Sequence, residues 1–418
     1  MTMRDPDPLD QLAASLSDGA EFLNTLNGPF RRSFRLHPRR GTPAGWGVLE
    51  PIPWTSSGRF TTSDCDPGDF LDYHIGTIYP QDAASQVPVL LLAPQPGEVI
   101  IDTCAAPGSK STQIGIALGD DGLLVCCDSA VPRRRILAEN LARQGIACGI
   151  VTPMAVHVLA ERHPHVADGV LVDAPCSGHE SRSAKQVTRM AERQLALLNE
   201  AARLVRGGGR LVYSTCTPYV GENETVIQQF LQAHPTWRVE IMLLPGCDAD
   251  LAGLGAVRLW PQRQGAEPFF ACRLRAPDDA PTCDSLRGRE PLADPLLARW
   301  LPQSPLHCWS NGRTRFIAST QAASCALPSE ARGLVLAHGD DGALEPWAAQ
   351  ALIERGAPAQ KVDHDVALRL WAGDSMDLPG DSDCLVATTE GAPLGVLAGS
   401  GETRRLRLPS RLYRSGLR

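Results

Sequence analysis

The sequence Val99-Ile-Ile-Asp-Thr-Cys-Ala-Ala-Pro-Gly-Ser-Lys110 contains the pattern that decides the fold. A short apolar run ends in an acid, a Gly/Pro turn follows, and the helical stretch Ser111–Leu118 comes next. Ligands of parallel α/β sheets bind at the carboxyl ends of strands, beside turns of this kind. Small residues let a ligand approach the backbone, and a helix N-terminus favours an anionic group. We therefore expect the loop Cys104–Lys110 to hold a cofactor.

The loop lacks two common nucleotide-binding motifs, and this limits which cofactors it is expected to bind. It matches neither GxGxxG nor GxxxxGK followed by Ser or Thr, which disfavours a dinucleotide and a nucleoside triphosphate. Asp128 follows the next predicted strand, Gly122–Cys127, at the position where an acid would hold the two hydroxyls of a ribose. A methionine-derived cofactor fits this geometry as well as NAD does. A Gly/Pro turn without a ligand is the alternative.

Predicted strands and helices alternate from about residue 79 to 275, which is typical of a parallel α/β sheet. The further elements predicted there are the helices Pro132–Gln144, Ala191–Val205 and Glu224–Ala233 and the strands Gly169–Val172, Leu211–Tyr213 and Phe269–Leu274. The triplet Gly207-Gly208-Gly209 is expected to close the second of these helices. The flanking sequence predicts three further parts, namely an α+β module over 1–78 opening with the helical stretch Leu9–Leu26, a linker over 276–294 and a β-rich module over 295–418.

Composition excludes several classes of protein. No apolar run approaches the roughly 18–20 residues of a membrane span, and Met1–Asp10 lacks the apolar segment of a signal peptide. We therefore expect a cytoplasmic protein that contacts no membrane. The 13 cysteines form no CxxC pair, so we predict no metal site, and most of these thiols should be reduced and buried.

Two arginine-rich segments stand out in a chain whose net charge is −7. Gly28–Arg40 has five arginines and no acid, and Thr403–Arg418 has six arginines and no acid. Such segments are commonly solvated surface, but two of them in an acidic chain favour contacts with phosphates. We expect Arg31–Arg40 and Arg404–Arg414 to present arginine clusters beside the cofactor site. The chain has three lysines, and one of them, Lys110, lies in the cofactor loop.

Two cysteines differ from the others in their position. Cys176 lies in Asp173-Ala-Pro-Cys-Ser-Gly178 and Cys216 in Ser214-Thr-Cys-Thr-Pro218, each just after a predicted strand. Both should therefore reach the edge of the sheet that holds the cofactor loop. A thiolate is a strong nucleophile, and Lys110 nearby is expected to lower a thiol pKa. The alternative for each is a small buried residue.

These motifs together resemble the Sun-type RNA cytosine-C5 methyltransferases, and within them the RsmB/RsmF-like 16S ribosomal RNA enzymes. The resemblance covers about 79–275 and rests on Tyr79–Val89, Pro96-Gly-Glu98, the CAAPGSK loop, Asp128 with Arg133 and Asn140, DAPCSG, GGRLVYSTC, Glu222-Asn-Glu224, Arg258–Pro261 and Phe269-Phe270. It implies a Rossmann-like class I methyltransferase sheet of seven strands. More weakly, Arg35–Arg40 resembles a strand of the family's N-terminal module. The segments Ala367–Gly373, Gly391–Gly395 and Leu408-Pro409 resemble its PUA-like RNA-binding domain.

The resemblance also implies roles for the residues of the site. Cys216 would be the nucleophile that adds to C6 of cytosine, and Cys176 would promote product release. Thiolate addition at C6 makes C5 enamine-like, and a carboxyl at N3, for which Asp173 is placed, would assist it. Lys110 and Asp173 would reach the base. S-adenosyl-L-methionine would be bound by Cys104, Ala105, Ala106, Pro107, Gly108, Ser109, Lys110, Asp128, Arg133 and Asp173.

The sequence departs from the family pattern at three positions. Ala155 replaces an acid that usually contacts the adenine side of the cofactor, His179 alters the segment after DAPCSG, and Gln262 replaces a histidine. We expect a monomer whose partner is RNA, most simply ribosomal RNA, with rRNA processing as its role. Transfer RNA is the alternative substrate. Two further hypotheses are a non-catalytic ribosome assembly factor and a methyltransferase that acts on a small molecule or a protein.

Overall fold

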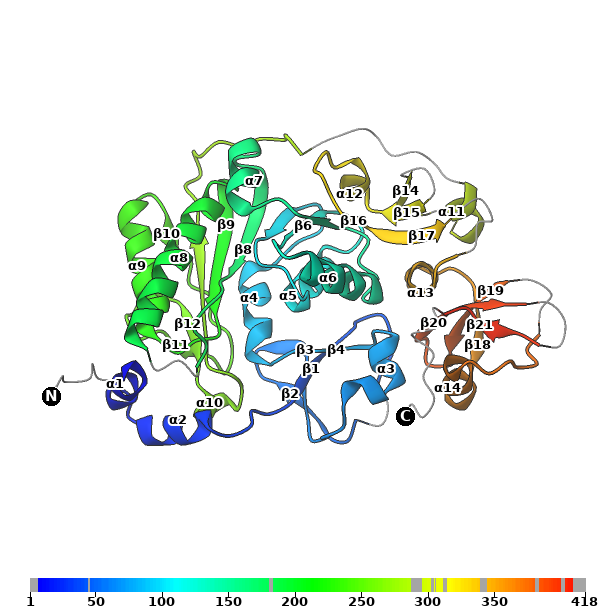
Figure 1. Ribbon diagram of the computed structural model, residues 1–418, viewed down its shortest axis with the longest axis horizontal. Coiled ribbons are helices and arrows are strands. Elements are labelled where there is room, and N and C mark those ends of the chain that lie inside the picture. The colour runs from blue at the N-terminus through cyan, green and yellow to red at the C-terminus, as the bar shows by residue number, and fades with distance from the viewer. Residues whose placement is uncertain are drawn as a thin grey trace.

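The computed structural model describes residues 7–43, 46–179, 183–286, 295–301, 304, 306–310, 314–338, 344–379, 383–399 and 403–408. Within these ranges the strands form a large central sheet, a four-stranded sheet before it and two small sheets after it (Figure 1). None of the helices in the described ranges combines the length and the apolar character that a membrane span requires.

The central sheet has ten strands in the order β11-β12-β13-β9-β8-β5-β6-β7-β16, with β10 paired to β13. The strands β7, β6, β5, β8 and β9 run parallel, whereas β13 pairs antiparallel with β9 and β12 pairs antiparallel with β13. The bounds of the strands are β5 Val99–Asp102, β6 Leu123–Cys127, β7 Gly149–Thr152, β8 Ala167–Asp173, β9 Val205–Thr215, β10 Arg238–Val239, β11 Asp248–Ala249, β12 Val257–Leu259, β13 Phe269–Arg275 and β16 Ala331–Arg332. Seven of them, β12-β13-β9-β8-β5-β6-β7, make the predicted seven-strand arrangement, and three short strands extend it.

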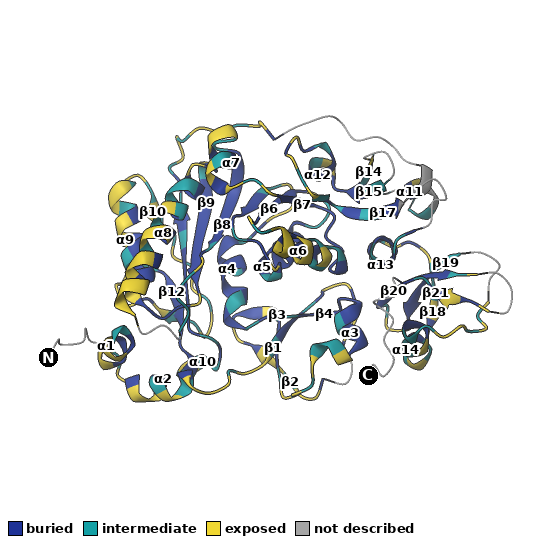
Figure 2. Cartoon of the chain, viewed as in Figure 1, coloured by how far each residue is buried: buried dark blue, intermediate teal, exposed yellow. Residues whose placement is uncertain are grey.

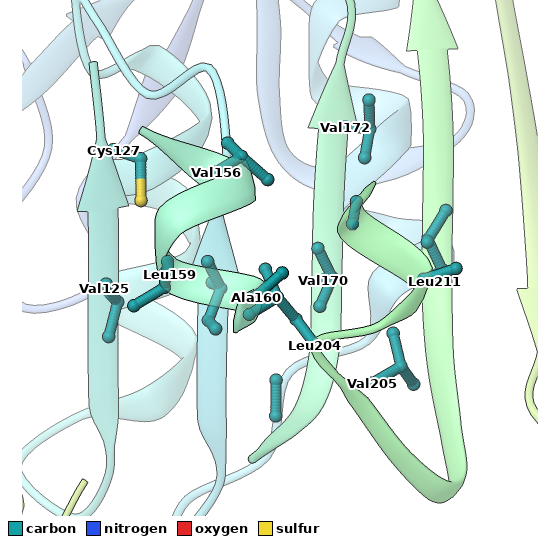
Figure 3. Close-up of a cluster of buried hydrophobic side chains, with 14 of the residues drawn as sticks. Val125, Cys127, Val156, Leu159, Ala160, Val170, Val172, Leu204, Val205 and Leu211 are labelled. Carbon is teal, nitrogen blue, oxygen red and sulfur yellow. The ribbon is translucent and has the colours of Figure 1, made fainter. Parts of the chain in front are cut away.

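Alternating apolar residues along the strands cover both faces of this sheet. In β6, for example, Val125 and Cys127 belong to one buried cluster, and Leu124 and Cys126 belong to the other. Figure 3 shows the first cluster, in which the side chains of one helix pack across several strands. This alternation gives a three-layer α/β/α domain. Figure 2 shows how the central strands are buried while the outer faces of the helices are exposed. The helices are α4 Val87–Leu92, α5 Ser109–Leu118 and α6 Val131–Arg143 against one face, and α7 Val156–Arg162, α8 Ala184–Ala202 and α9 Glu224–Ala233 against the other.

The triplet Gly207-Gly208-Gly209 does not close a helix, so that prediction is wrong. Helix α8 ends at Ala202, and the three glycines lie inside β9. Residues 277–281 lie against them, and the backbone N–H of Gly207 donates to the carbonyl of Pro281 at 3.0 Å. A Cβ on Gly207 would lie 2.2 Å from the carbonyl oxygen of Ala280. The glycines are therefore needed for close approach of two backbone segments.

The N-terminal part forms the sheet β2-β3-β1-β4, which lies beside α4 and α5 (Figure 1). The predicted single helical stretch Leu9–Leu26 is wrong, because Leu16 has an extended backbone and separates two helices. The elements here are α1 Pro8–Ser15, α2 Gly19–Leu26, β1 Ser33–Leu36, β2 Leu49–Ile52, β3 Thr55–Thr61, η1 Pro67–Asp69, α3 Leu71–His74, β4 Ile78–Pro80 and η2 Ala84–Gln86.

The C-terminal part contains the sheets β14-β15-β17 and β18-β19-β20-β21, and its short strand β16 pairs with β7 of the central sheet. The prediction of a β-rich module is incomplete, since four helices occur among the described residues of this part. Of the predicted linker, 287–294 lie outside the described residues. The elements are α11 Pro295–Trp300, β14 His307–Ser310, β15 Thr314–Ala318, α12 Thr320–Ser324, β17 Leu334–His338, α13 Pro346–Glu354, β18 Ala359–Val362, α14 His364–Ala372, β19 Cys384–Thr388, β20 Pro393–Ala398 and β21 Arg405–Leu406.

The described arginines of the two segments are divided between exposed and buried side chains, so the expected clusters beside the site stay a prediction. Exposed among them are Arg31, Arg32, Arg39 and Arg405. Arg35, Arg40 and Arg404 are 2%, 0% and 0% exposed. Arg40 donates to the backbone carbonyls of Ile75 and Arg143 at 2.5 Å and forms an ion pair with Glu354 of α13. These contacts join three distant segments of the chain, which is why the guanidinium is buried. The part of the second segment from 409 to 418 lies outside the described residues.

Candidate active site

The two cysteine motifs meet at the carboxyl edge of the central sheet. Asp173 at the end of β8 is opposite Ser214 in β9, so the chain segments that follow lie side by side. As a result, Cys176 Sγ lies 3.4 Å from Cys216 Sγ. This distance confirms the prediction that both thiols share one site.

A turn before α9 holds both cysteine segments in place. The backbone N–H of Ser177 donates to Glu222 Oε2 at 3.1 Å, and Gln194 donates to the same oxygen at 2.7 Å. Asn223 donates to the carbonyl of Thr217 at 2.9 Å. Glu222 and Asn223 are both fully buried. The segment Glu222-Asn-Glu224 belongs to the family pattern, but its local sequence does not predict this positioning role.

Lys110 and Asp173 form an ion pair beside the thiols. Lys110 Nζ lies 2.7 Å from Asp173 Oδ2 and also donates to Ser85 Oγ at 3.1 Å. The other carboxylate oxygen, Asp173 Oδ1, accepts from Ser214 Oγ at 2.7 Å. Burial disfavours the charge of Lys110, but the adjacent Asp173 outweighs that effect and raises the pKa of the ammonium. The Lys110 ammonium therefore keeps its charge.

The two thiols differ in exposure and in protonation. Cys216 is exposed, whereas Cys176 is half-buried. Their hydrogen bond lowers the pKa of Cys176 and raises the pKa of Cys216. Burial and the nearby Asp173 raise the pKa of Cys216 further. Lys110 does attract the Cys216 thiolate, which raises the pKa of Lys110, but the other effects are larger, so the pKa of Cys216 is raised and not lowered as expected.

The predicted cofactor loop joins β5 to α5 at the same edge. Asp102 is 1% exposed, and its carboxylate accepts from Ser111 Oγ at 2.7 Å and from the backbone N–H of Cys104 at 3.3 Å. Burial raises the pKa of Asp102 to about 6. Burial also raises the pKa of Cys104 to about 12, so this thiol stays protonated. Gly108 has φ +115°, a value that favours glycine, and a Cβ there would lie 3.1 Å from Leu137.

Helix α6 supports the far side of this loop. Arg133 donates to the carbonyl of Ala106 at 2.5 Å, and Asn140 donates to the carbonyl of Pro107 at 2.9 Å. Asp128 follows β6, and its Oδ2 lies 3.4 Å from the Arg133 guanidinium. Asp128 is buried while the Arg133 side chain is 56% exposed. Helix α6 thus holds the backbone of the loop through two hydrogen bonds, and the Asp128 carboxylate lies next to it.

The three positions that depart from the family pattern have structural roles. Ala155 is the N-terminal capping residue of α7 and offers no side-chain hydrogen bond. The His179 ring contacts Phe30 edge to face, with centroids 5.5 Å apart. Gln262 donates to Asp18 at 3.1 Å, so it joins the central domain to α2. The residues 180–182 that follow His179 lie outside the described ranges.

A parallel sheet with an antiparallel β13, a Gly/Pro loop after β5 and a thiol pair at the same edge define a Rossmann-like methyltransferase domain. Residues 89–275 match the family model described as 16S rRNA methyltransferase RsmB/F. The chain belongs to this Sun-type RsmB/F family, so the resemblance seen in the sequence is confirmed.

Individual relatives agree with this assignment. The chain is 31% identical over 281 residues to ribosomal RNA small subunit methyltransferase F of Shewanella amazonensis, covering 61% of this chain and 60% of the relative. It is 32% identical over 294 residues to tRNA (cytosine(49)-C(5))-methyltransferase of Pyrococcus abyssi, covering 63% of this chain and 94% of the relative. The fold is similar to the crystal structure of NSun6 from Pyrococcus horikoshii with SFG, with a TM-score of 0.58, 19% identity and coverage of 65% of this chain and 98% of that one. The match thus spans about three fifths of the Shewanella relative.

Proposed function

We propose that this protein transfers a methyl group from S-adenosyl-L-methionine to C5 of a cytosine in RNA, with 16S ribosomal RNA as the substrate. The observation that carries the proposal is the 3.4 Å contact between an exposed thiol and a half-buried one at the cofactor edge. A reaction that adds a nucleophile to a base and then removes it uses two such groups. Methylation of a small molecule or a protein gives no reason for the second thiol.

The residues present fit the proposed cofactor. Asp128 offers a buried carboxylate to the two ribose hydroxyls, and the backbone of Cys104–Gly108 allows close approach because Gly108 has no Cβ. The exposed Arg133 lies beside Asp128 and holds the loop through Ala106. Pro107, Ser109, Lys110 and Asp173 complete the proposed cofactor set. When bound, S-adenosyl-L-methionine supplies an electrophilic methyl group.

The exposure of the two thiols assigns their roles. Cys216 is the thiol that a base can reach, so we infer that it adds to C6, while Cys176 lies behind it. In the resting arrangement Cys176 has the lower pKa. Cys176 is therefore the thiol that ionises first. Its thiolate then takes the Cys216 proton across the 3.4 Å contact, which leaves Cys216 as the thiolate that attacks. After methylation at C5, loss of the C5 proton to solvent breaks the C6–S bond, and Cys176 assists this release by returning its proton to the departing Cys216 thiolate.

The Lys110–Asp173 pair contributes to the addition step. Both Asp173 oxygens already accept hydrogen bonds, from Lys110 and from Ser214. The carboxylate is thus fixed in position with a proton donor, the Lys110 ammonium, directly beside it. Addition at C6 increases the negative charge on the ring, and a proton offered at N3 by this pair stabilises that charge.

The choice of ribosomal RNA follows the names of the relatives. Several are ribosomal RNA small subunit methyltransferases, and one is a tRNA (cytosine(49)-C(5))-methyltransferase, which makes transfer RNA the second candidate. We further propose that 79–275 is the methyltransferase domain and that the parts over 1–78 and 295–418 bind RNA, the latter in a PUA-like manner. Trimming 295–418 should then weaken RNA binding and its dependence on salt.

The test uses single cysteine variants with labelled cofactor and separated ribosomal and transfer RNA. Cys216→Ala should abolish methylation and leave no covalent complex. Cys176→Ala should accumulate a protein–RNA adduct that survives denaturing electrophoresis and disappears on RNase treatment. Cys283→Ala, a half-buried thiol at the other end of the sheet, is the matched control and should behave as the parent protein. Normal methylation by both active-site variants would refute the mechanism.

A further inference from the structure

A pocket of about 590 Å³ lies between the N-terminal sheet and the thiol edge. Its lining comes from β1, from the end of β3, from the segment 63–67 and from the segment after β4, and it includes Asp82 and Glu267. Glu267 precedes β13, whose first residue, Phe269, has its ring 5.6 Å from Lys110 Nζ. The Glu267 carboxylate also raises the pKa of Cys216. The pocket therefore begins next to the proposed nucleophile, and its size lies within the range of about 300–1,000 Å³ that ligand sites occupy.

The charges of the pocket do not suit a phosphate. Its lining includes four carboxylates, against which stand Arg31 and Arg32. Arg31 already forms an ion pair with Glu50, and Arg32 donates to the backbone carbonyl of Cys65 at 2.9 Å. A phosphate here would meet an excess of negative charge. A ligand that presents N–H donors would meet acceptors instead. The four carboxylates belong to Asp64, Asp66, Asp82 and Glu267.

The four carboxylates of the pocket differ in how many hydrogen bonds they already accept. Asp66 accepts from the backbone N–H of Gly68, and Asp82 accepts from the backbone N–H groups of Ala84 and Glu267. Within the described part of the chain, the side chains of Asp64 and Glu267 have no hydrogen-bond or ion-pair partner. Burial raises the pKa of Glu267, so a donor that reached this carboxylate would stabilise its charged form. The pocket thus contains two carboxylates whose oxygens are free to accept.

Flat apolar groups complete the lining. Phe30 lines the pocket and contacts the ring of His179, three residues beyond Cys176. Behind it, Phe34 and Trp46 are 2% and 3% exposed and pack edge to face, with centroids 5.1 Å apart, so they support the wall of the pocket without offering a free ring face. Unpaired bases in RNA are bound by stacking on aromatic rings and by hydrogen bonds to their edges. The accessible part of the Phe30 ring, combined with unused carboxylate oxygens, fits a base that carries an amino group.

We propose that this pocket binds the base of a nucleotide adjacent to the target cytosine, and that it selects a purine with an exocyclic amino group. The exposed Asp64 accepts from that amino group, and the half-buried Phe30 ring receives the two-ring system. This inference rests on the proposed function, because a nucleotide can be adjacent to the target only if Cys216 attacks a cytosine in RNA. Adenine and guanine share the required chemistry, whereas uracil has no amino group.

The test is a covalent selection with a pool of RNAs. Each RNA holds one 5-fluorocytosine with random bases on both sides, because the C5 fluorine prevents release and traps the adduct. The full-length protein is incubated with the pool and S-adenosyl-L-methionine, and the RNA that stays attached under denaturing conditions is sequenced. Adenine or guanine should exceed uracil at one adjacent position by about tenfold, the effect of one hydrogen bond to a charged group. Asp64→Asn keeps an acceptor but loses the charge, so it should reduce that preference severalfold without changing the total yield of adduct.

Asp69→Asn is the matched control, because Asp69 is an acid close by that does not line the pocket. It should keep the purine preference. No preference at either adjacent position, or a preference that Asp64→Asn leaves unchanged, would overturn the assignment of the pocket. Absence of any adduct would instead refute the proposed function, and the subsite with it. Adduct formation without base selection would leave the methyltransferase reaction standing and reject only the subsite.

Discussion

Two regions of the molecule hold buried charges but use them differently. One is the thiol edge, where Lys110 and Asp173 lie beside Cys216, and the other is the junction where Arg40 meets Glu354. At the thiol edge the Lys110 and Asp173 side chains are 9% and 29% exposed, and Cys216 beside them is open to solvent. At the junction the side chains of both Arg40 and Glu354 are 0% exposed, and further contacts to backbone carbonyls surround the guanidinium. Access by a second molecule, rather than the presence of charge, separates a reactive site from a structural one.

The junction also shows how a charge becomes structural. His37 lies 3.8 Å from Glu354, and burial lowers the pKa of this histidine well below its ordinary value. Because His37 is neutral, the negative charge of Glu354 is compensated by Arg40 and by the half-exposed Arg39. At the thiol edge, by contrast, the Cys216 proton can move to Cys176. The first region holds its protonation state constant, whereas the second one changes it during the proposed reaction.

The largest effect is expected from removing the buried acid of the junction. Glu354→Gln should lower the free energy of unfolding by about 3–5 kcal/mol, because Arg40 would keep a buried charge without a counter-charge. Urea unfolding measures this change. Glu50→Gln, at the exposed Arg31–Glu50 pair, is the control and should cost less than about 1 kcal/mol. Equal costs in the two variants would show that burial does not distinguish these ion pairs.

A second effect concerns Asp102, a buried acid of the thiol edge with no ion pair among the described residues. Its pKa is raised to about 6 by burial, so the folded state favours its protonated form. Its contribution to stability is therefore complete below about pH 4 and is lost as the pH rises to about 6. Asp102→Asn should remove this dependence, a difference of roughly 2–3 kcal/mol between about pH 4 and pH 7. Parallel urea curves of parent and variant across that range would contradict the raised pKa.

The smallest of the three effects is expected at the turn that positions the thiols. Glu222→Gln removes an acceptor of the Ser177 N–H and Gln194 bonds, so the Cys176 segment should shift slightly. We expect kcat to fall by about 10- to 100-fold with KM for RNA nearly unchanged, since misplacement affects the reacting groups. Thr188→Ala, an exposed change on the adjacent helix, is the control. A rise in KM with normal kcat would place Glu222 in RNA binding instead.

Much of the site could be predicted from local sequence. Each motif follows an apolar strand, and the carboxyl ends of parallel strands meet at one edge, so Cys104–Lys110, Cys176 and Cys216 were expected together. The strand and helix cores were also readable, because burial on two faces requires long apolar runs and helical spacing. Helix α9, Glu224–Ala233, has the bounds that the pattern predicted.

Other features depended on partners that are distant in the chain. Arg40 and Glu354 are 314 residues apart, so the sequence could not distinguish a buried arginine from one that contacts phosphate. Gly207 also depends on a distant partner. It lies inside a strand and does not end a helix, because residues 277–281 pack against it. The sequence alone determined which residues have the chemistry of a methyltransferase and which edge they share. Only the tertiary structure decided which thiol is exposed and which charges are buried, because exposure depends on what the rest of the chain places around each side chain.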